Sequence, residues 1–492
     1  MPYLLALDEG TTSARAAVYD EQAQRIAIEA VGFNLNYPNP GWVEVDADVV
    51  WGSQLSAARR VLDASKVDAK EILAVGITNQ RETTVIWEKA TGRPVGPAIV
   101  WQCRRTASFC DALAHGPYSK YIEQTTGLVI DAYFSGSKIR WLLENAKDGL
   151  ARAANGELLF GTIDTWLIWK LTNGKVHVTD TTNASRTMLM DLETGEWDQE
   201  LLRIFQIPPA ILPRIVGSSE VVGVTDPDLF GAAIPIAGIA GDQQAALFGQ
   251  ACFHPGLTKN TYGTGCFALM QTGSKRPVSA NRLLATRAAC EQAHPYYALE
   301  GSVFVGGAAM QFLRDNLGLF GDVNLTGELA KSVPDTGGVY MVPAFTGMGA
   351  PYWDPDVRGI ICGLTRATTR AQVIRAGLES IAFQSYDLFE AMRGDTGQPP
   401  KELRVDGGAS SNDFLMQFQA DLLDCPVVRP VDIESTALGA AYLAALGIGH
   451  FRETSDLEGF WRIEKSFEPK LRASDRLNLL DGWKSAVGKA RH

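Results

Sequence analysis

The chain has 492 residues, and its 45 Lys and Arg against 56 Asp and Glu give a formal net charge of −11 at pH 7. With 46% hydrophobic and 21% charged residues, the composition is that of a globular protein of about two to four domains, which excludes a largely disordered chain. The acidic balance argues against nucleic acid or an anionic membrane as the main partner, but it does not exclude a small basic pocket for a phosphate.

The predicted elements alternate between short apolar runs and longer helical patterns, which indicates an α/β architecture. The first element is a hairpin, with strands at 4–7 and 15–19 around a Gly/Thr turn at 10–13. The further expected elements are helices at 49–62, 139–145 and 371–392, and buried strands at 72–77 and 234–240. No low-complexity tract or long Pro/Ser linker occurs, so any domain boundary must be a tight hinge.

A second hairpin repeats the layout of the first about half a chain later. The segment that begins at Lys259 again predicts a strand, a Gly/Thr turn and a returning strand. Two such hairpins predict two similar halves that face each other. We place the hinge at 248–253, so the predicted domains are 1–248 and 249–492.

The Gly/Thr turns suggest a nucleotide-binding enzyme, because backbone N–H groups and hydroxyls in a tight turn can surround phosphate oxygens. A P-loop is excluded, since neither Gly174-Lys175 nor Gly488-Lys489 has the glycine upstream or the hydroxyl downstream that this motif requires. Residues 263–268 loosely match the dinucleotide fingerprint, but a strand is predicted after them where the fingerprint must open a helix. A dehydrogenase is therefore disfavoured.

A cradle made of two hairpin turns accounts better for these residues. One side would be residues 10–13 and the other 263–265, and Asp8 at the end of its strand would hold a hydrated Mg²⁺ by way of its waters. A third glycine turn at 406–409, leading into a helix, would let adenosine approach the backbone closely. Singly, each feature has a simpler interpretation as a tight turn or a helix cap. Together, in this order, they favour an ATP site.

Polar residues follow two of the predicted strands, at the edge where α/β sheets bind ligands. Arg81 and Glu82 would offer a hydrogen-bond donor and acceptor to the hydroxyls of a polyol, unless they form a surface ion pair. Asp242 would accept the proton of an attacking hydroxyl, or it is a plain helix N-cap. A carboxylate is too weak to ionise an alcohol beforehand, so it would take the proton late, in a loose phosphoryl-transfer transition state. The residues alone thus predict an ATP-dependent enzyme with a small polar substrate.

Several motifs resemble those of the FGGY family of carbohydrate kinases, which have the actin-like ATPase fold. The matching stretches are 8–13 (DEGTTS), 79–83 (NQRET), 133–141 (YFSGSKIRW), 241–244 (GDQQ) with 260–265 (NTYGTG), and 405–408 (VDGG) through 417–421 (QFQAD). Between them, 343–355 (PAFTGMGAPYWDP) is also highly characteristic. The resemblance covers nearly the whole chain.

The resemblance implies an α/β fold of two actin-like, ribonuclease H-like ATPase domains that face each other across a catalytic cleft. It also implies direct in-line transfer of the γ-phosphoryl group of ATP to glycerol, giving sn-glycerol 3-phosphate, with Mg²⁺ positioned by Asp8 and Asp242 as general base. The polyol would be bound by Arg81, Glu82, Tyr133, Asp242 and Gln243, with Trp101 and Phe267 as an apolar wall. The nucleotide would be bound by Thr11, Thr12, Ser13, Arg15, Thr264, Gly307, Gln311, Gly408 and Asn412.

The chain departs from the family pattern at two places. Glu9 stands where the family usually has Gln, and it adds negative charge near the predicted phosphate hairpin. The loop at 229–234 lacks the arginine that some bacterial members use to bind a sugar bisphosphate inhibitor, and the histidine that others expose for regulatory phosphorylation. We therefore expect neither form of regulation.

Two alternatives stay open at this point. A sibling kinase would phosphorylate a pentulose or a four-carbon polyol, although Arg81 and Glu82 with Trp101 and Tyr133 favour glycerol. An actin-like structural or chaperone-type ATPase would use the same nucleotide site without any polyol, which the polar cluster argues against.

The cysteines and the N-terminus predict a cytoplasmic protein. The seven cysteines are dispersed without a C-x-x-C, as expected for reduced thiols, and no two of the six histidines have metal-ligand spacing, so a structural zinc site is not expected. The first ten residues lack a positive region, and Asp8 interrupts their apolar run, so we expect no secretory signal. We expect no membrane span, no nucleic-acid partner and a homodimer or homotetramer.

Overall fold

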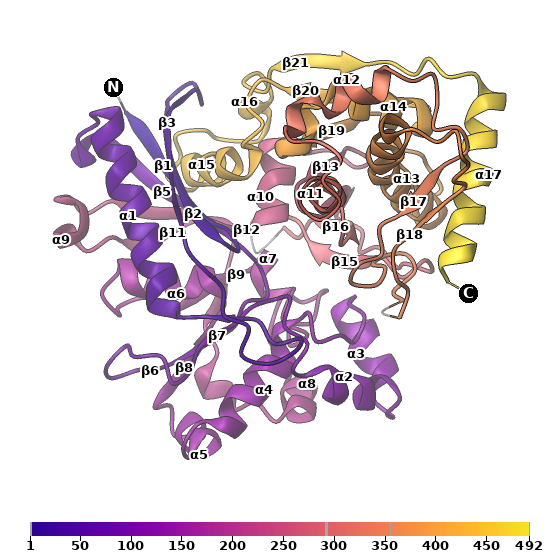
Figure 1. Ribbon diagram of the computed structural model, residues 1–492. Coiled ribbons are helices and arrows are strands. Elements are labelled where there is room, and N and C mark those ends of the chain that lie inside the picture. Colours follow the sequence, from indigo (N-terminus) through magenta and orange to yellow (C-terminus); the bar gives the residue numbers. More distant parts are fainter. Residues whose placement is uncertain (1, 291–293, 355, 492) are drawn as a thin grey trace.

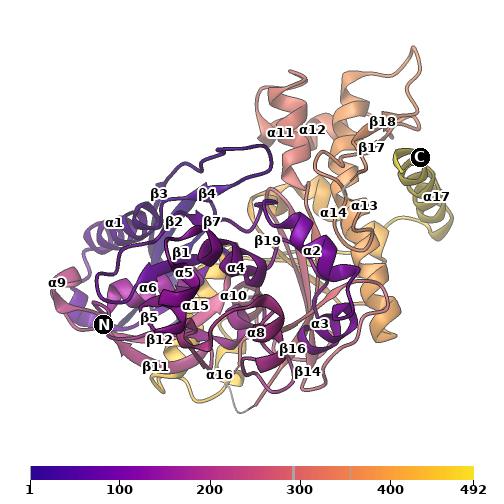
Figure 2. The same ribbon diagram turned by 90° about the horizontal axis from the view of Figure 1, so that it is seen from below.

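The computed structural model describes residues 2–290, 294–354 and 356–491. The chain forms two halves, each built around one large mixed β-sheet (Figure 1). The N-terminus lies on the first half and the C-terminus at the outer edge of the second, so the two ends are far apart in both ribbon views (Figures 1 and 2).

The first sheet has the strand order β11-β12-β5-β1-β2-β3. Its strands are β1 (Tyr3–Glu9), β2 (Ser13–Asp20), β3 (Arg25–Gly32), β5 (Ile72–Asn79), β11 (Ser219–Val224) and β12 (Pro235–Gly241). The strands β1 and β2 form the predicted hairpin, and Asp8 lies opposite Arg15. Because β5 and β12 run parallel to β1, the residues that follow these three strands meet at one edge of the sheet. The strands expected in this half are confirmed.

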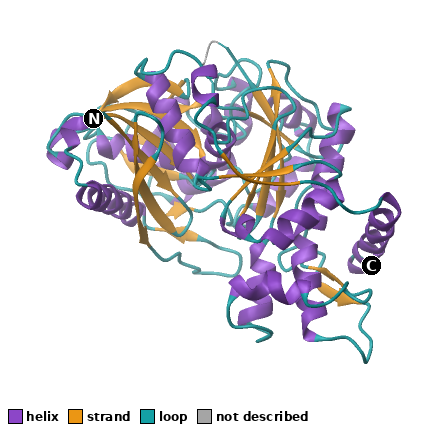
Figure 3. Cartoon of the chain, turned by 90° about the horizontal axis from the view of Figure 1, so that it is seen from above, coloured by secondary structure: helices purple, strands orange, loops and turns teal. Residues whose placement is uncertain are grey.

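The second half is built around a sheet of its own, and Figure 3 shows the orange strands in two separate groups. Its order is β15-β16-β14-β13-β19-β20-β21, with β13 (Thr258–Tyr262), β14 (Cys266–Gly273), β15 (Leu284–Arg287), β16 (Tyr297–Val303), β19 (Leu403–Asp406), β20 (Val427–Pro430) and β21 (Ile463–Phe467). The series β16-β14-β13-β19-β20 has the same parallel and antiparallel pairings as β3-β2-β1-β5-β12. The predicted repeat of the hairpin is therefore confirmed.

Two helices cross between the halves. The helix α10 (Asp242–Gly249) follows β12 of the first sheet and contacts β13 and β14 of the second. The helix α15 (Ser435–Gly447) follows β20 of the second sheet but packs on β1, β5 and β12 of the first, where Figure 1 shows it beside the indigo strands. The halves are thus joined by exchanged packing as well as by the chain.

Helices cover both sheets and form the outer parts of the molecule. In the first half they are α1 (Ala47–Ser65), α2 (Ala107–Ala114), α3 (Ser119–Thr126), α4 (Ser135–Asn145), α5 (Gly149–Ala154), α6 (Ile163–Leu171), α7 (Thr181–Ala184), α8 (Gln199–Phe205) and α9 (Pro227–Phe230), with the short helices η1 (Ala69–Glu71) and η2 (Pro209–Ile211). In the second half they are α11 (Gly307–Asp315), α12 (Thr326–Lys331), α13 (Arg370–Thr396), α14 (Asp413–Leu423), α16 (Ser455–Glu458) and α17 (Ala473–Ala490), with η3 (Val323–Leu325) and η4 (Gly408–Ser411). The three helices predicted from periodicity correspond to α1, α4 and α13.

Short strand pairs complete the fold. They are β4 (Glu44–Val45) with β7 (Ala98–Ile99), β6 (Val85–Glu88) with β8 (Leu158–Gly161), β9 (Val178–Asp180) with β10 (Arg214–Val216), and β17 (Tyr340–Val342) with β18 (Ile360–Cys362). The described part of the chain contains no helix long and apolar enough to cross a membrane.

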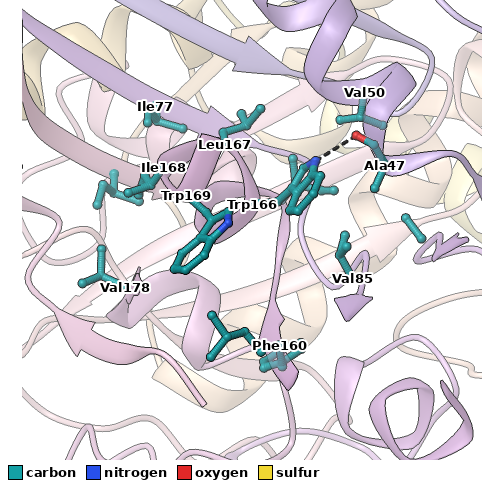
Figure 4. Close-up of a cluster of buried hydrophobic side chains, with 14 of the residues drawn as sticks. Ala47, Val50, Ile77, Val85, Phe160, Trp166, Leu167, Ile168, Trp169 and Val178 are labelled. Atoms are coloured by element: carbon teal, nitrogen blue, oxygen red, sulfur yellow. Dashed lines mark hydrogen bonds between the residues drawn. The ribbon is translucent and has the colours of Figure 1, made fainter. Parts of the chain in front are cut away.

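The core of the first half is packed around the tryptophans of α6 (Figure 4). Trp166 is fully buried, and its indole N–H donates a 2.8 Å hydrogen bond to the carbonyl of Ala47, so its polar atom is satisfied inside an apolar cluster. Ile77 of β5 belongs to the same core. Because Ile77 lies only two residues before the end of β5, this core fixes the strand end that the predicted polyol-binding residues follow.

Candidate active site

Arg81 is the centre of a buried ionic cluster that joins the two halves. It follows β5 and is 2% exposed. Its two terminal nitrogens lie 2.5 and 2.9 Å from the carboxylate oxygens of Glu300 on β16, and its Nε lies 3.1 Å from Oδ1 of Asp242. The alternative of a surface ion pair at this strand end is therefore wrong.

A second arginine completes the cluster. Nε of Arg186 lies 2.7 Å from Oε1 of Glu82, and its NH2 lies 3.0 Å from Oε1 of Glu300. Burial alone would raise the pKa of Glu300, but the charges of Arg186 and Arg81 outweigh it and lower this pKa to about 2. Glu300 is thus a fixed negative charge between two arginines.

The backbone at Glu82 is held in an unusual conformation. Its φ of 60° lies in the left-handed region, which costs of order 1–3 kcal/mol for a residue with a side chain. The hydroxyl of Ser135 and the ammonium of Lys138 both donate to the carbonyl of Glu82, each at 3.1 Å. These contacts hold the strained turn, and they direct the Glu82 carboxylate to Arg186.

Three aromatic rings from both halves lie next to one another. The ring centroids of Trp101 and Tyr133 are 5.6 Å apart, and those of Trp101 and Phe267 are 6.4 Å apart, both edge to face. Phe267 belongs to β14, so the group spans the interface between the halves. The indole N–H of Trp101 donates to the hydroxyl of Thr11 at 2.9 Å, which ties this aromatic group to the first hairpin.

Asp242 begins α10 at the end of β12. Its side chain is 29% exposed, unlike the buried carboxylates around it, so it is accessible to a small molecule. The N-cap of α10 is Gly241, so the alternative interpretation of Asp242 as the cap is wrong. Burial raises the pKa of Asp242, although Arg81 and Lys259 oppose this, and a more basic carboxylate accepts a proton more readily.

A buried lysine from the second half holds Gln243. The ammonium of Lys259 on β13 donates to the side-chain carbonyl of Gln243, to the hydroxyl of Thr261 at 2.8 Å and to the backbone carbonyl of Phe267 at 3.2 Å. Burial lowers the pKa of Lys259 to about 8, against the opposing charges of Asp406 and Asp242. Gln243 is thus oriented from across the interface.

The first hairpin turn is tight and partly exposed. The N–H of Gly10 donates to the carbonyl of Ser13 at 3.0 Å, Thr12 is exposed, and Thr11 is half-buried. Arg15 lies 3.3 Å from Oδ2 of Asp8 and 3.0 Å from Glu434. The turn therefore presents a cation, hydroxyls and backbone N–H groups at the same sheet edge as Asp242.

Asp8 has the chemistry of an outer ligand for Mg²⁺. It is buried at the end of β1, and its Oδ2 forms the ion pair with Nε of Arg15 at 3.3 Å but accepts no hydrogen bond from any residue that the structure describes. Among those residues no group of three or more His, Cys, Asp or Glu side chains that could hold a metal ion occurs. Burial and the neighbouring Asp8 raise the pKa of Glu9 well above its usual range. Burial without a hydrogen-bond partner thus disfavours the charged form of Glu9, whose two carboxylate oxygens have none among the described residues.

The second hairpin turn opens onto a cavity of about 510 Å³ in the second half. Its lining includes all five residues of this half that were predicted to bind nucleotide: Thr264, Gly307, Gln311, Gly408 and Asn412. The N–H of Gly307 donates to the carbonyl of Gly263 at 2.9 Å, so α11 begins directly against the turn. Thr11, Thr12, Ser13 and Arg15 do not line this cavity within the described chain and lie instead on the first hairpin.

Comparison with protein families matches one known domain to each half of the chain. Residues 3–249 match the N-terminal domain of the FGGY family of carbohydrate kinases, and residues 258–448 match its C-terminal domain. The chain belongs to the FGGY family. Among curated relatives, glycerol kinase 2 of Thermotoga maritima is 54% identical over 490 residues, covering 100% of this chain and 99% of the relative. The glycerol kinase of Deinococcus radiodurans is 52% identical over 489 residues, covering 99% and 97%.

Solved structures of FGGY kinases have the same fold. The crystal structure of Plasmodium falciparum glycerol kinase with ADP matches this chain with a TM-score of 0.92 at 33% identity, covering 100% of this chain and 98% of that one. A ligand-bound xylulose kinase from Lactobacillus acidophilus has a TM-score of 0.88 at 23% identity, covering 99% and 97%, and shares the fold. The predicted class of two actin-like domains is thereby confirmed.

Sequence reasoning missed three members of the site of this FGGY kinase. Arg186, Lys259 and Glu300 are buried charged residues in contact with predicted polyol residues. Glu300 lies 219 positions from Arg81, so no local spacing could have joined them. The available signal was weak: each is a charged residue inside or next to an apolar strand pattern.

Proposed function

We propose that this FGGY kinase phosphorylates glycerol with ATP and forms sn-glycerol 3-phosphate by direct in-line transfer, with Asp242 as general base. The observation that carries the proposal is the polar group of Arg81, Glu82 and Asp242 beside an aromatic wall, at the junction of the two halves. The relatives named glycerol kinase, which are more than half identical over almost the whole chain, support the choice of glycerol.

The polyol is held by donors and acceptors that are already oriented. Arg81 and Gln243 offer N–H groups, Glu82 offers a carboxylate, and each is fixed by a charged partner from another element. The rings of Trp101 and Phe267 pack against the carbon chain. A site that bonds each hydroxyl rejects analogues that lack one, since its own buried polar groups would be left without partners.

Asp242 orients the attacking hydroxyl and takes its proton late in the transfer. The loose transition state of phosphoryl transfer needs little activation of the nucleophile, so a carboxylate suffices. Arg81 stays bound to Glu300 and Asp242 throughout, which keeps the carboxylate aimed at the hydroxyl.

The nucleotide spans the two hairpins, with adenosine in the cavity of the second half and the phosphates between Thr11–Ser13 and Thr264. Thr11, Thr12, Ser13 and Arg15 would meet the phosphate oxygens from the first half, and Gly307, Gln311, Gly408 and Asn412 would surround the nucleoside. Asp8 would hold a Mg²⁺ ion by way of water, and the ion would supply positive charge that offsets the charge of the phosphates. The exchanged helices α10 and α15 pack against the strands of the two hairpins, α10 against β13 and β14 and α15 against β1 and β2. Closure of the halves around the polyol would exclude competing water.

The identity of the product tests this proposal. Incubation with ATP, Mg²⁺ and glycerol, followed by chiral separation of the phosphorylated product, is expected to yield the sn-3 enantiomer alone. A mixture of both enantiomers would contradict the fixed orientation of the polyol, and absence of any phosphorylated glycerol would contradict the proposed reaction.

A further inference from the structure

Glu300 is the one residue of the second half that contacts Arg81 within the described cluster, although it reaches no substrate position in the proposed reaction. Its two oxygens bind both terminal nitrogens of Arg81, at 2.5 and 2.9 Å. A paired contact of this kind fixes both the position and the plane of a guanidinium. The remaining Nε of Arg81 is then directed at Asp242.

The carboxylate of Glu300 also fixes the position of the Glu82 side chain, through Arg186. NH2 of Arg186 lies 3.0 Å from Glu300, while its Nε lies 2.7 Å from Glu82. Glu300 therefore supports a donor and an acceptor of the predicted polyol site at once. All four residues of this network are buried, where a charge left without its partner is costly.

We propose that Glu300 is a positioning residue that completes the polyol site from the second half, so that polyol recognition depends on the docking of the two halves. Glu300 acts through Arg81 and Arg186 and touches no substrate. This inference rests on the proposed function, because Arg81 and Glu82 are polyol-binding residues only if that function holds.

The test compares Glu300→Gln with a matched control, Glu379→Gln. Glu379 is a second buried glutamate paired with an arginine, Arg375 at 2.7 Å, but it lies on α13 away from the polyol cluster. Glu300→Gln places an amide against the arginines, and we expect the KM for glycerol to rise about tenfold or more, while the KM for ATP changes by less than about twofold. Glu379→Gln should alter the melting temperature without altering the KM for glycerol.

Two further variants separate positioning from a structural role. Glu300→Asp keeps the charge and should recover part of the affinity for glycerol that Glu300→Gln loses. In an Arg81→Ala background, Glu300→Gln should raise the KM for glycerol by a smaller factor than it does alone, because one of the two arginines through which it acts is gone and only the contact with Arg186 remains.

The inference is overturned if Glu300→Gln leaves the KM for glycerol unchanged, if its effect is equally large in the Arg81→Ala background, or if neither Glu300 variant folds to bind ADP. In the last case Glu300 is only a structural residue. The wild type is assayed in parallel, and its failure to phosphorylate glycerol would overturn the proposed function instead.

Discussion

At the scale of single residues, the proposed chemistry centres on Asp242, a partly exposed carboxylate among buried ones. We predict that Asp242→Asn lowers kcat by about 10²- to 10⁴-fold, because the amide cannot accept the proton of the attacking hydroxyl. Binding of ADP, measured by calorimetry, should be unchanged because Asp242 lies outside the lining of the nucleotide cavity.

Asp226→Asn is the control for this substitution. Asp226 is also a carboxylate at a helix start, and it caps α9 by accepting from the N–H of Asp228 at 3.1 Å. The control should keep its turnover, since Asn is as good a cap as Asp. Normal turnover by Asp242→Asn would show that Asp242 is not the general base.

The lowered pKa of Lys259 predicts that activity falls at alkaline pH. Its pKa is lowered to about 8, so above that pH the ammonium loses a proton and donates fewer hydrogen bonds to Gln243 and Thr261. We expect kcat/KM for glycerol to fall as the pH rises through about 8. In Lys259→Met the value should be low at neutral pH and show a smaller decrease, which a pH series of initial rates measures. The decrease that is left belongs to Lys138, whose pKa burial also lowers to about 8 and which holds the carbonyl of Glu82.

Unfolding does not explain such a decrease. The pKa of Lys259 in the folded protein lies below its ordinary value of 10.5, so the unfolded chain binds the proton more tightly and this group favours folding increasingly between about pH 8 and 10.5. The contribution of Lys259 to stability, measured as the difference in melting temperature between the wild type and Lys259→Met, should therefore rise over the range in which activity falls. A difference that shrinks as the pH rises would contradict the assignment to Lys259.

At the scale of elements, the position of the site depends on how closely α15 approaches the first sheet and α10. A Cβ on Gly76 of β5 would lie 2.0 Å from the carbonyl oxygen of Ala440, and one on Gly439 would lie 1.9 Å from that of Ala245. Neither distance is tolerable for a real side chain, so glycine is required at both positions. This packing holds α10, and with it Asp242, against the end of β5.

Two glycine-to-alanine substitutions in helices should therefore have opposite effects. Gly439→Ala in α15 is expected to lower the free energy of unfolding by about 1–3 kcal/mol, because the methyl group meets the backbone of α10. Gly52→Ala in α1, where a Cβ would have no neighbour within 4 Å, is expected to raise it by about 0.5–1 kcal/mol. Urea denaturation measures both. Equal effects of the two substitutions would mean that α15 does not pack this closely.

Elements were predicted well from the sequence because their patterns are local. The hairpin of β1 and β2 follows from two short apolar runs around a Gly/Thr turn, and the helices α1, α4 and α13 repeat apolar residues at the helical period. The exchange of α10 and α15 was not predicted, since an apolar helix does not indicate which sheet it covers. The contacts of Arg81 with Glu300 were missed for the same reason.

At the scale of the whole molecule, the proposed function assigns the polyol mainly to the first half and the nucleoside to the second. The cavity of the second half is lined by Gly408, where an added Cβ would have no neighbour within 4 Å. We predict that Gly408→Leu fills this cavity and raises the KM for ATP by about tenfold or more, equivalent to at least about 1.4 kcal/mol of binding, with a smaller change in the KM for glycerol.

Gly488→Leu on α17 is the matched control. This glycine also has open space around its Cβ position, but it does not line the cavity. The control should leave both KM values unchanged. A normal KM for ATP in Gly408→Leu would show that adenosine does not bind in this cavity.

The domain boundary at 248/249 and the homodimeric or homotetrameric state stay predictions, which limited proteolysis and light scattering can test.

The measurement that tests the central claim most directly is the rate of ADP release from Mg-ATP with glycerol, D-xylulose, erythritol or no acceptor. The arrangement of Arg81, Glu82 and Trp101 predicts a kcat/KM for glycerol that exceeds the values for the longer acceptors by at least about tenfold, with little ADP released when no acceptor is present. Faster turnover with D-xylulose or erythritol than with glycerol would contradict this assignment of the polyol site.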